Sequence, residues 1–313
     1  MESGRKISVI VPCFNEEEGL STFNQTLIRC LPETYSYEII YVNDGSSDNT
    51  FQVITSLAKS NPDIKYISFS RNFGHQNALK AGYDFASGDC AISLDADLQH
   101  PPDVIPELIA KWEEGFEIVN TMRNDHQSIS LAKKMSSRIF YGIMRKLSDV
   151  HIENGMADFR LIDKKVLKQL KLFNENYLFF RGIIPWMGFR QTIVPFTANE
   201  RFAGTTKYTF KKMLKFATTG VTAFSVKPLK ISIYLGSVIA LVSFIYGLYA
   251  AYIHIFTDRA ITGWTSVIFS VLFIGGINLL MLGIIGEYLG KLFIENKRRP
   301  NYLISDTNLI EKD

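Results

Sequence analysis

Short apolar runs alternate with amphipathic segments through the first third of the chain. The apolar runs, which predict buried strands, are Ile7–Val11, Tyr37–Val42, Ile64–Ser70 and Cys90–Leu94. The segments with helical periodicity follow them in turn, at Glu16–Leu31, about Asp48–Ser60, Gln76–Ala86 and Pro106–Glu114. Because the strands are continuously apolar and alternate with helices, the pattern predicts an α/β fold with a mostly parallel sheet covered on both faces.

Polar residues cluster where each of the four predicted strands ends. The clusters are Asn15-Glu16-Glu17, Asn43-Asp44-Gly45, Arg71-Asn72 and Asp95-Ala96-Asp97. Parallel strands place their carboxyl ends at one edge of a sheet, and ligands bind beyond that edge. We therefore expect four loops to converge on a single binding site.

Two long apolar runs dominate the last quarter of the chain. Ile231–Phe256 carries no formal charge over about 26 residues, and a second run extends from Trp264 to about Ile285. Each is long enough to cross a hydrocarbon core of about 30 Å, which favours a transmembrane hairpin over two buried core helices. Arg259 is the only cation in the turn between the two runs, whereas many cations flank the hairpin. The positive-inside rule therefore places both flanks in the cytosol. The flanking cations are Lys207, Lys211, Lys212, Lys215, Lys227, Lys230, Lys291, Lys297, Arg298 and Arg299.

Two further features concern the membrane region. Residues 209–224 mix lysines with apolar side chains, which predicts a helix in the membrane interface; an ordinary amphipathic surface helix is the alternative. Gly286 and Gly290 permit close helix packing. That spacing suits a homo-oligomer and equally suits the two helices of one hairpin.

Composition narrows the choice of partners and compartment. The net charge of +3 is too mild to argue for nucleic acid as a partner. Cys13, Cys30 and Cys90 lack metal-type spacing, which predicts small core residues in a reducing compartment. The N-terminus offers no secretory signal, so we expect the part of the chain before the apolar runs to lie in the cytosol. The histidines show no ligand spacing, so a histidine metal site is not expected.

An acidic pair supplies the first candidate chemistry. Asp95 and Asp97 stand one residue apart where a buried strand ends. Such a pair suits Mg²⁺ or Mn²⁺, which takes one or two protein carboxylates and completes its shell with water and phosphate oxygens. A solvated acidic turn is the alternative.

Two other strand ends carry side chains that suit a nucleotide. Asn15 and Glu17 follow a turn stiffened by Pro12 and can present hydrogen bonds to a base or ribose. They also suit the N-cap and first turn of a helix. Asp44 is placed to accept from a uracil N–H or a ribose hydroxyl, although its motif also suits a turn followed by a cap.

Taken together, the motifs resemble family two glycosyltransferases of the GT-A fold. Those that carry the resemblance are Pro12…Asn15-Glu16-Glu17, Asn43-Asp44-Gly45-Ser46-Ser47-Asp48 and Asp95-Ala96-Asp97-Leu98-Gln99-His100-Pro101-Pro102. Ser70–His75 and the tail Gly286…Gly290 with Arg299…Tyr302 are similar to polyprenyl-phosphate glycosyltransferases, including bactoprenol glucosyltransferases and, more distantly, dolichol-phosphate mannose synthase. The resemblance covers nearly the whole chain and does not specify the sugar.

The resemblance implies roles on the donor side of a site. The implied nucleotide-binding or donor-binding positions are Pro12, Asn15, Glu17, Asp44, Arg71, Asp95, Ala96 and Gln99. Asp97, together with Asp95, would hold Mg²⁺ or Mn²⁺ against the diphosphate and so stabilise the departing nucleotide. These enzymes invert, which implies one in-line displacement without a covalent intermediate.

Asp158 matches the position where the family places its proposed general base. A lipid phosphate has a second pKa near 6 and is largely ionised at cytosolic pH, so it needs a strong base less than a sugar hydroxyl does. Asp158 is therefore also a candidate to orient the acceptor or to bind a donor hydroxyl. An exposed carboxylate beginning a strand is the simplest alternative. We expect Arg160 to neutralise its charge.

Three cations are candidates for the acceptor phosphate. Arg201 and Lys207 flank Gly204 in a basic loop and are assigned a catalytic role, with closure over the diphosphate or grip on the lipid phosphate as the mechanism. Arg181 is a further candidate for the acceptor. A solvated positive-inside cluster is the alternative. The chain lacks the Gln-x-x-Arg-Trp of processive polysaccharide synthases, which counts against a polymerase.

The sequence thus predicts a membrane-anchored transferase of one sugar from a UDP-sugar to undecaprenyl phosphate, for cell-envelope glycan modification. Glucose is the first expectation and N-acetylglucosamine the second. Predicted boundaries are a GT-A domain at 1–208, interfacial helices at 209–230, transmembrane helices at 231–256 and 264–289 around a turn at 257–263, and a cytoplasmic tail at 290–313. Alternatives are a membrane glycan-extending synthase and a non-catalytic nucleotide-sugar-binding scaffold for a flippase. Both termini are expected in the cytosol at the cell membrane.

Overall fold

The computed structural model describes residues 4–124, 155–176, 178–197, 225–256 and 263–309. The chain forms two compact units. One consists mainly of the chain up to Lys215 together with Pro300–Asp313, and the other mainly of Phe216–Arg299. The predicted basic loop at 201–208 and the predicted interfacial segment at 209–224 lie outside the described residues.

A mixed sheet forms the centre of the first unit, with the strand order β7-β5-β6-β4-β1-β2-β3-β8. Its strands are β1 (Lys6–Cys13), β2 (Ser36–Asn43), β3 (Ile64–Phe69), β4 (Cys90–Ser93), β5 (Ile118–Asn124), β6 (Met156–Asp163), β7 (Gln191–Thr197) and β8 (Ile304–Thr307). The neighbours β4, β1, β2 and β3 are parallel. Strand β6 runs antiparallel to β4 and β5, and β8 runs antiparallel to β3. The parallel part carries the four strands predicted from the sequence.

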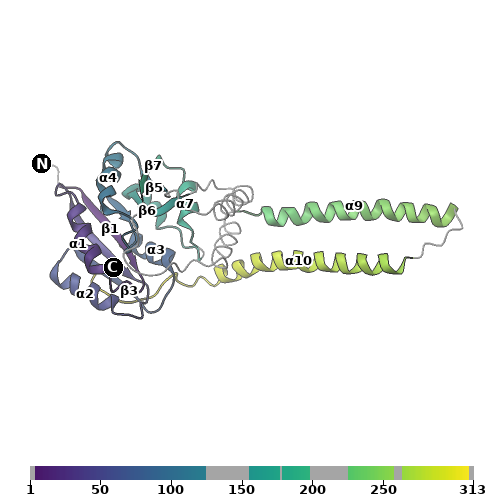
Figure 1. The fold of residues 1–313 in the computed structure, drawn as a ribbon, viewed down its shortest axis with the longest axis horizontal. Coiled ribbons are helices and arrows are strands. Elements are labelled where there is room, and N and C mark those ends of the chain that lie inside the picture. The colour runs from purple at the N-terminus through teal and green to yellow at the C-terminus, as the bar shows by residue number, and fades with distance from the viewer. Residues whose placement is uncertain (1–3, 125–154, 177, 198–224, 257–262, 310–313) are drawn as a thin grey trace. The chain divides into compact units, whose positions relative to one another are not determined.

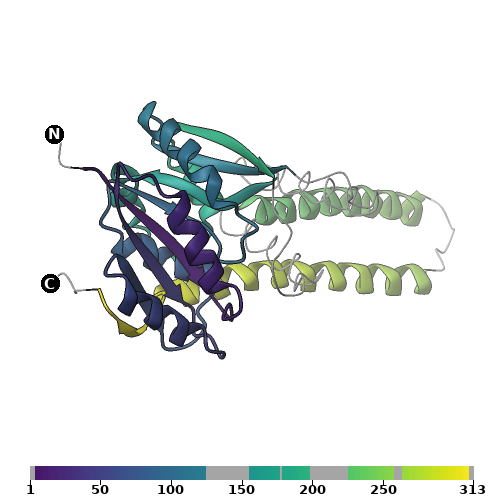
Figure 2. The ribbon, with the colours of Figure 1, turned by 60° about the vertical axis from the view of Figure 1, so that its left-hand side comes forward.

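Helices cover both faces of this sheet (Figure 1, Figure 2). They are α1 (Leu20–Cys30), α2 (Thr50–Ser60), α3 (His75–Phe85), the 3₁₀ helix η1 (Pro102–Val104), α4 (Ile105–Glu113), α6 (Lys164–Leu170) and α7 (Phe180–Trp186). Side chains of α1, α2 and α4 share one buried cluster with Val9 and Tyr41 of the sheet. Successive strand residues point to opposite faces, so Ile10 faces the other side. There α3 approaches so closely that a Cβ on Gly82 would lie 2.1 Å from Cγ2 of Ile10.

The elements predicted in the first third of the chain agree with the structure except at the first helix. Strands β1 to β4 and helices α2, α3 and α4 begin and end within about two residues of the predicted bounds. Helix α1 begins at Leu20 instead of Glu16, and Gly19 is its N-cap residue. The N-cap expected at Asn15 is therefore wrong, because Asn15 adopts a left-handed φ of 56° four residues before the helix cap. In the last quarter, α9 (Lys227–Phe256) begins four residues before its predicted start at residue 231, and α10 (Trp264–Asn296) continues past its predicted end at residue 289.

Two long helices make up the described part of the second unit. Helix α9 (Lys227–Phe256) and helix α10 (Trp264–Asn296) lie side by side and antiparallel (Figure 1, Figure 2). Their most apolar spans, Lys227–Tyr249 and Ser270–Asn296, have mean hydropathies of 2.0 and 1.8 and are not buried by protein. The 30 residues of α9 extend about 45 Å at 1.5 Å per residue, enough to cross a bilayer core. The hairpin is therefore built for association with a membrane.

Candidate active site

The loops after β1 and β2 are fastened to each other by hydrogen bonds. Oδ1 of Asn15 accepts the backbone N–H of Ser47 at 2.8 Å, and the N–H of Asn15 donates to Oγ of Ser46 at 3.1 Å. Oε2 of Glu17 accepts the N–H of Asn49 at 2.9 Å. The polar cluster predicted as a nucleotide contact or a helix cap thus holds the neighbouring loop in place.

Asp44 holds the third loop. Its carboxylate is buried and accepts the N–H of Phe73 at 2.7 Å and the N–H of Gly74 at 3.0 Å. Burial raises the pKa of Asp44 above its ordinary value, although these two amides oppose the rise. Gly45 follows at φ 62°, and a Cβ there would lie 2.3 Å from the carbonyl carbon of Arg71. The turn after β2 therefore requires glycine so that the loop after β3 can rest on it.

The fourth loop meets the third through a carboxylate between two imidazoles. Nε2 of His75 lies 2.8 Å from Oδ1 of Asp95, and Nδ1 of His100 lies 3.4 Å from Oδ2 of the same carboxylate. The backbone N–H of Asp95 donates to that Nδ1 at 3.1 Å. Burial raises the pKa of Asp95, but His100 and His75 outweigh burial and hold it well below its ordinary value. Burial lowers the pKa of His75, yet Asp95 and then Asp158 outweigh it and raise that pKa to about 9. His75 is thus a cation at neutral pH.

The loop after β4 also carries Asp97, the second carboxylate predicted as a metal ligand. Oδ1 of Asp97 accepts the N–H of Gln99 at 3.1 Å, across a left-handed Leu98 at φ 60°. Among the described residues, no three His, Cys, Asp or Glu side chains gather closely enough to hold a metal ion. Mg²⁺ and Mn²⁺ accept one or two protein carboxylates, with water and phosphate oxygens completing the shell. Asp95 and Asp97 are the two carboxylates that the loop after β4 offers to such an ion.

Asp158 forms the other side of the site together with two arginines. It is the third residue of β6, is 6% exposed, and its Oδ1 lies 2.9 Å from Nη2 of Arg160. Its Oδ2 lies 3.0 Å from Nη2 of Arg181, which α7 supplies. The expected neutralisation by Arg160 is confirmed, and the alternative of an exposed carboxylate is wrong because the strand lies inside the sheet.

The same arginines decide the charge of Asp158. Burial alone would raise its pKa, but Arg181 and then Arg160 outweigh burial and lower that pKa to about 2. Arg160 is fully buried, and its Nε and Nη1 have no hydrogen-bond partner among the described residues. Asp158 is therefore a permanent anion at neutral pH, whose two oxygens hold guanidinium groups.

The structure brings most of the predicted site residues together and adds His75 and His100 to them. Pro12 pairs with Val42 inside the parallel sheet, and Ala96 is buried beside the acidic pair. Arg71 stacks its guanidinium 4.0 Å from the ring centre of Phe73. Arg201 and Lys207 lie outside the described residues.

His75 and His100 were missed by the sequence analysis, which tested histidines for metal-ligand spacing. Their partner is the carboxylate of Asp95. The available signal was their position directly after two of the polar clusters, in the same loops as the predicted donor contacts.

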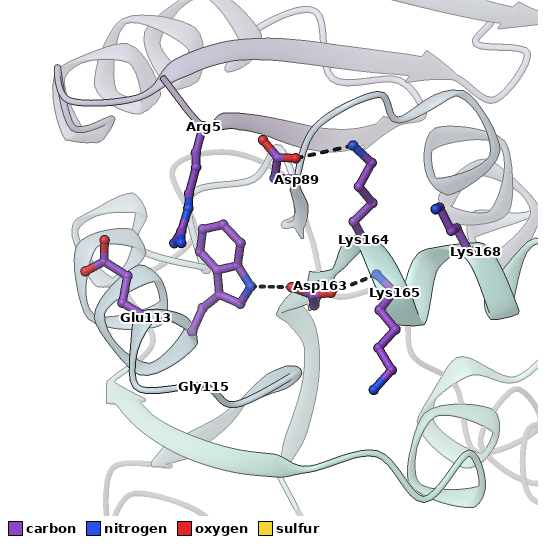
Figure 3. Close-up of a pocket in the computed structure, with 9 residues that line it drawn as sticks. Arg5, Asp89, Glu113, Gly115, Asp163, Lys164, Lys165 and Lys168 are labelled. Carbon is purple, nitrogen blue, oxygen red and sulfur yellow. Dashed lines mark hydrogen bonds and ion pairs between the residues drawn. The ribbon is translucent and has the colours of Figure 1, made fainter. Parts of the chain in front are cut away.

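A hollow of about 840 Å³ lies at the end of the parallel strands opposite to the candidate site (Figure 3). Arg5 and Asp89, which line it, precede β1 and β4. Several of its polar groups satisfy one another: Asp89 pairs with Lys164 at 3.3 Å, and Nε1 of Trp112 donates to Asp163 at 2.7 Å. None of the predicted site residues lines this hollow.

Comparison with known families identifies the class of protein. The model of glycosyl transferase family 2 matches residues 8–171, and the model of the GtrB C-terminal hairpin matches residues 227–292. The chain belongs to glycosyl transferase family 2, with a GT-A-type catalytic unit and a C-terminal hairpin, and it is a hexosyltransferase.

Individual relatives are similar over nearly their whole length. The prophage bactoprenol glucosyl transferase homolog of Escherichia coli (strain K12) is 43% identical over 301 residues, 96% of this chain and 98% of that one. The bactoprenol glucosyl transferase of Shigella phage SfV is 40% identical, covering 96% and 98%. The uncharacterized glycosyltransferase YkcC of Bacillus subtilis (strain 168) is 42% identical, covering 97% and 94%. The predicted family is confirmed.

Proposed function

We propose that the protein transfers one sugar, with inversion, from a UDP-sugar to undecaprenyl phosphate at the cytoplasmic face of the membrane. The main support for the proposal is that Arg181 is held by the buried carboxylate of Asp158 beside the loop that carries Asp95 and Asp97. Arg181 is fixed by Asp158, and His75 lies close enough to interact electrostatically with Asp95, Asp158 and Arg181. A phosphate nucleophile and a sugar diphosphate can therefore meet within one site.

The acceptor side binds a phosphate and needs no proton acceptor. The second pKa of a lipid phosphate, near 6, leaves a phosphate oxygen anionic at neutral pH. With a pKa of about 2, Asp158 would be a poor base there. We assign Asp158 to orienting Arg181, whose guanidinium suits bidentate contact with the acceptor phosphate. Arg201 and Lys207 are proposed to add cations to the same phosphate.

The donor side binds the nucleotide through the loops after β1 to β4. We assign Asn15, Asp44 and Arg71 to shaping the nucleotide pocket and Asp95 to the ribose or sugar. A divalent cation bound at Asp97 would supply Lewis-acid stabilisation of the leaving diphosphate. In the transfer, a phosphate oxygen of the lipid forms a bond to the anomeric carbon while the bond to UDP breaks. UDP leaves with the electron pair, and an α-linked donor gives a β-linked product.

The membrane hairpin and the relatives support the choice of acceptor and sugar. Helices α9 and α10 suit a bilayer by length and composition, and basic residues gather at the start of α9 and at the end of α10. Two of the relatives described above carry the name bactoprenol glucosyl transferase or its homolog. On this basis we propose glucose as the sugar, with N-acetylglucosamine as the second candidate, and cell-envelope glycan modification as the use of the product.

The test is a transfer assay with the full chain in detergent micelles. UDP-glucose, UDP-N-acetylglucosamine and other UDP-sugars are each incubated with undecaprenyl phosphate and Mg²⁺ or Mn²⁺, and UDP release and glycolipid mass are measured. We expect lipid-dependent UDP release and an adduct of a single hexose. Repeated additions would indicate a glycan-extending synthase, and donor binding without turnover on any sugar would contradict the proposed reaction.

A further inference from the structure

The chain returns to the catalytic sheet after the second apolar helix. Helix α10 ends at Asn296, and β8 (Ile304–Thr307) pairs antiparallel with β3 at the edge of the sheet. The sequence analysis predicted no strand in this tail. An unpaired edge strand exposes backbone donors and acceptors, and β8 covers those of β3. Covering the edge of β3 requires only backbone hydrogen bonds, so it does not account for the side-chain contacts that the tail makes with β3 and α3.

Tyr302, just before β8, contacts both elements that flank the loop after β3. Its ring stacks on Phe69, the last residue of β3, with centroids 5.0 Å apart. Its hydroxyl donates to Oδ2 of Asp84, in the last turn of α3, at 3.0 Å. Asp84 is itself paired with the buried Lys80. One side chain therefore links the strand before the loop to the helix after it.

The loop between these elements is the part of the site assigned to the donor. We call residues 70–74 the donor loop. The N–H of Ser70, its first residue, donates to the carbonyl oxygen of Leu303 at 3.0 Å. Phe69 also meets the ring of Phe73 edge to face, with centroids 5.7 Å apart. Phe73 and Gly74 in turn give their amides to Asp44. The contacts thus run without a break from Tyr302 to the Asp44 carboxylate.

We propose that Tyr302 is a positioning residue for donor binding, which holds the donor loop by tying the end of β3 to α3. The inference rests on the proposed function, since that function assigns the loop to the nucleotide. The segment that follows the membrane hairpin thereby becomes part of the donor site's support. It acts through Phe69 and Asp84 and need not touch the substrate.

Asn308 offers a matched control in the same tail. Its Nδ2 donates to the carbonyl oxygen of Ile64 at 3.1 Å, and its Oδ1 accepts the N–H of Tyr66 at 2.7 Å. These contacts lie at the beginning of β3, at the far end of the strand from the donor loop. Asn308→Ala therefore loosens the tail without touching the contacts that lead to Asp44.

Two measurements on the full chain in detergent micelles test the inference. UDP affinity in the presence of Mn²⁺ is measured by titration calorimetry, and hydrogen exchange of the 70–75 segment is measured without nucleotide. We expect Tyr302→Ala to weaken UDP binding about tenfold and to speed exchange in this segment by about as much. Tyr302→Phe, which keeps the stacked ring but loses the hydrogen bond to Asp84, should have an intermediate effect of about threefold, and Asn308→Ala should stay within about twofold of wild type.

The outcomes separate this inference from the function it rests on. If Tyr302→Ala leaves exchange in the donor loop unchanged, or if Asn308→Ala speeds it equally, the tail only covers the sheet edge and the inference is overturned. If the wild-type protein binds no UDP, the proposed donor is wrong, while the exchange measurement still decides whether Tyr302 holds the loop.

Discussion

The half of the site assigned to the donor and the half assigned to the acceptor are held in place by different interactions. On the donor side, the side chains of Asn15, Glu17 and Asp44 accept backbone N–H groups of neighbouring loops. On the acceptor side, Asp158 and Arg181 hold each other as a partly buried ion pair between a strand and a helix. The donor side is thus a set of mutually bonded loops, whereas the acceptor side depends on two charges.

This difference has a consequence for substitutions. Several hydrogen bonds share the task of shaping the donor loops, so loss of one of them should have a limited effect on binding. On the acceptor side one carboxylate serves both arginines, so loss of Asp158 would deprive Arg181 and the buried Arg160 of the anion that both contact. We therefore expect acceptor-side variants to lose more function than donor-side variants, with the metal ligand as the exception.

The largest expected effect on activity is at Asp97, the proposed metal ligand. Asp97→Ala should lower turnover by about a thousandfold or more, because the charge on the leaving diphosphate would lose its counter-ion. Asp103→Ala, which removes an exposed carboxylate from the nearby η1, should stay within about twofold. UDP release with saturating Mn²⁺ and lipid measures both. Equal losses in the two variants would refute a specific role for Asp97.

The next largest effect is expected at Arg181, and it tests whether the donor side and the acceptor side act separately. Arg181→Ala should lower kcat/KM for the lipid phosphate about a hundredfold and leave UDP affinity within about twofold. Arg190→Ala, which removes an exposed arginine stacked on Phe116, is the matched control. Lipid-dependent kinetics and UDP calorimetry separate the two substrates. A comparable loss of UDP affinity in Arg181→Ala would show that the two halves do not act separately.

The sequence predicted the donor side better than the acceptor side, for a physical reason. Strands β1 to β4 are continuous apolar runs whose ends are marked by polar residues, so topology alone brings their loops together. The pair of Asp158 and Arg181 joins residues 23 positions apart on different elements, which no local pattern reveals. Strand β8 contains Ser305, Asp306 and Thr307 and exists because β3 offers it an edge. The sequence indicates that Asp44 is a polar residue at a strand end. It does not reveal that its carboxylate accepts the backbone N–H groups of Phe73 and Gly74.

The third prediction concerns stability and its dependence on pH. Asp158 has a pKa of about 2 in the folded protein against about 3.9 in an unfolded chain. Such a group contributes stability on the order of a few kcal/mol above pH 4, which is lost as the pH falls from about 4 to 2. Asp158→Asn should therefore melt earlier than wild type at pH 7, and the difference should shrink as the pH approaches 3. Thermal unfolding across that range measures it.

Activity should respond to pH through a different group. If Asp158 only orients Arg181, the acidic limb of kcat/KM comes from the acceptor phosphate, near pH 6. The residual kcat/KM of Asp158→Asn should then fall over the same acidic pH range as that of the wild type. Loss of the limb in this variant would instead identify Asp158 as the base.

The smallest effect is expected at His75, where the two halves meet. His75 reaches Asp95 through Nε2, and the amide nitrogen of glutamine can occupy a similar position while that of asparagine is too short. If donor loops are held mainly by shared hydrogen bonds, His75→Gln should keep kcat/KM within about threefold, and His75→Asn should lose about tenfold. Steady-state kinetics on both substrates measure the pair. A loss in His75→Gln as large as that of Arg181→Ala would mean that the imidazolium charge, and not the hydrogen bond, holds Asp95, and the donor side would then depend on charge as the acceptor side does.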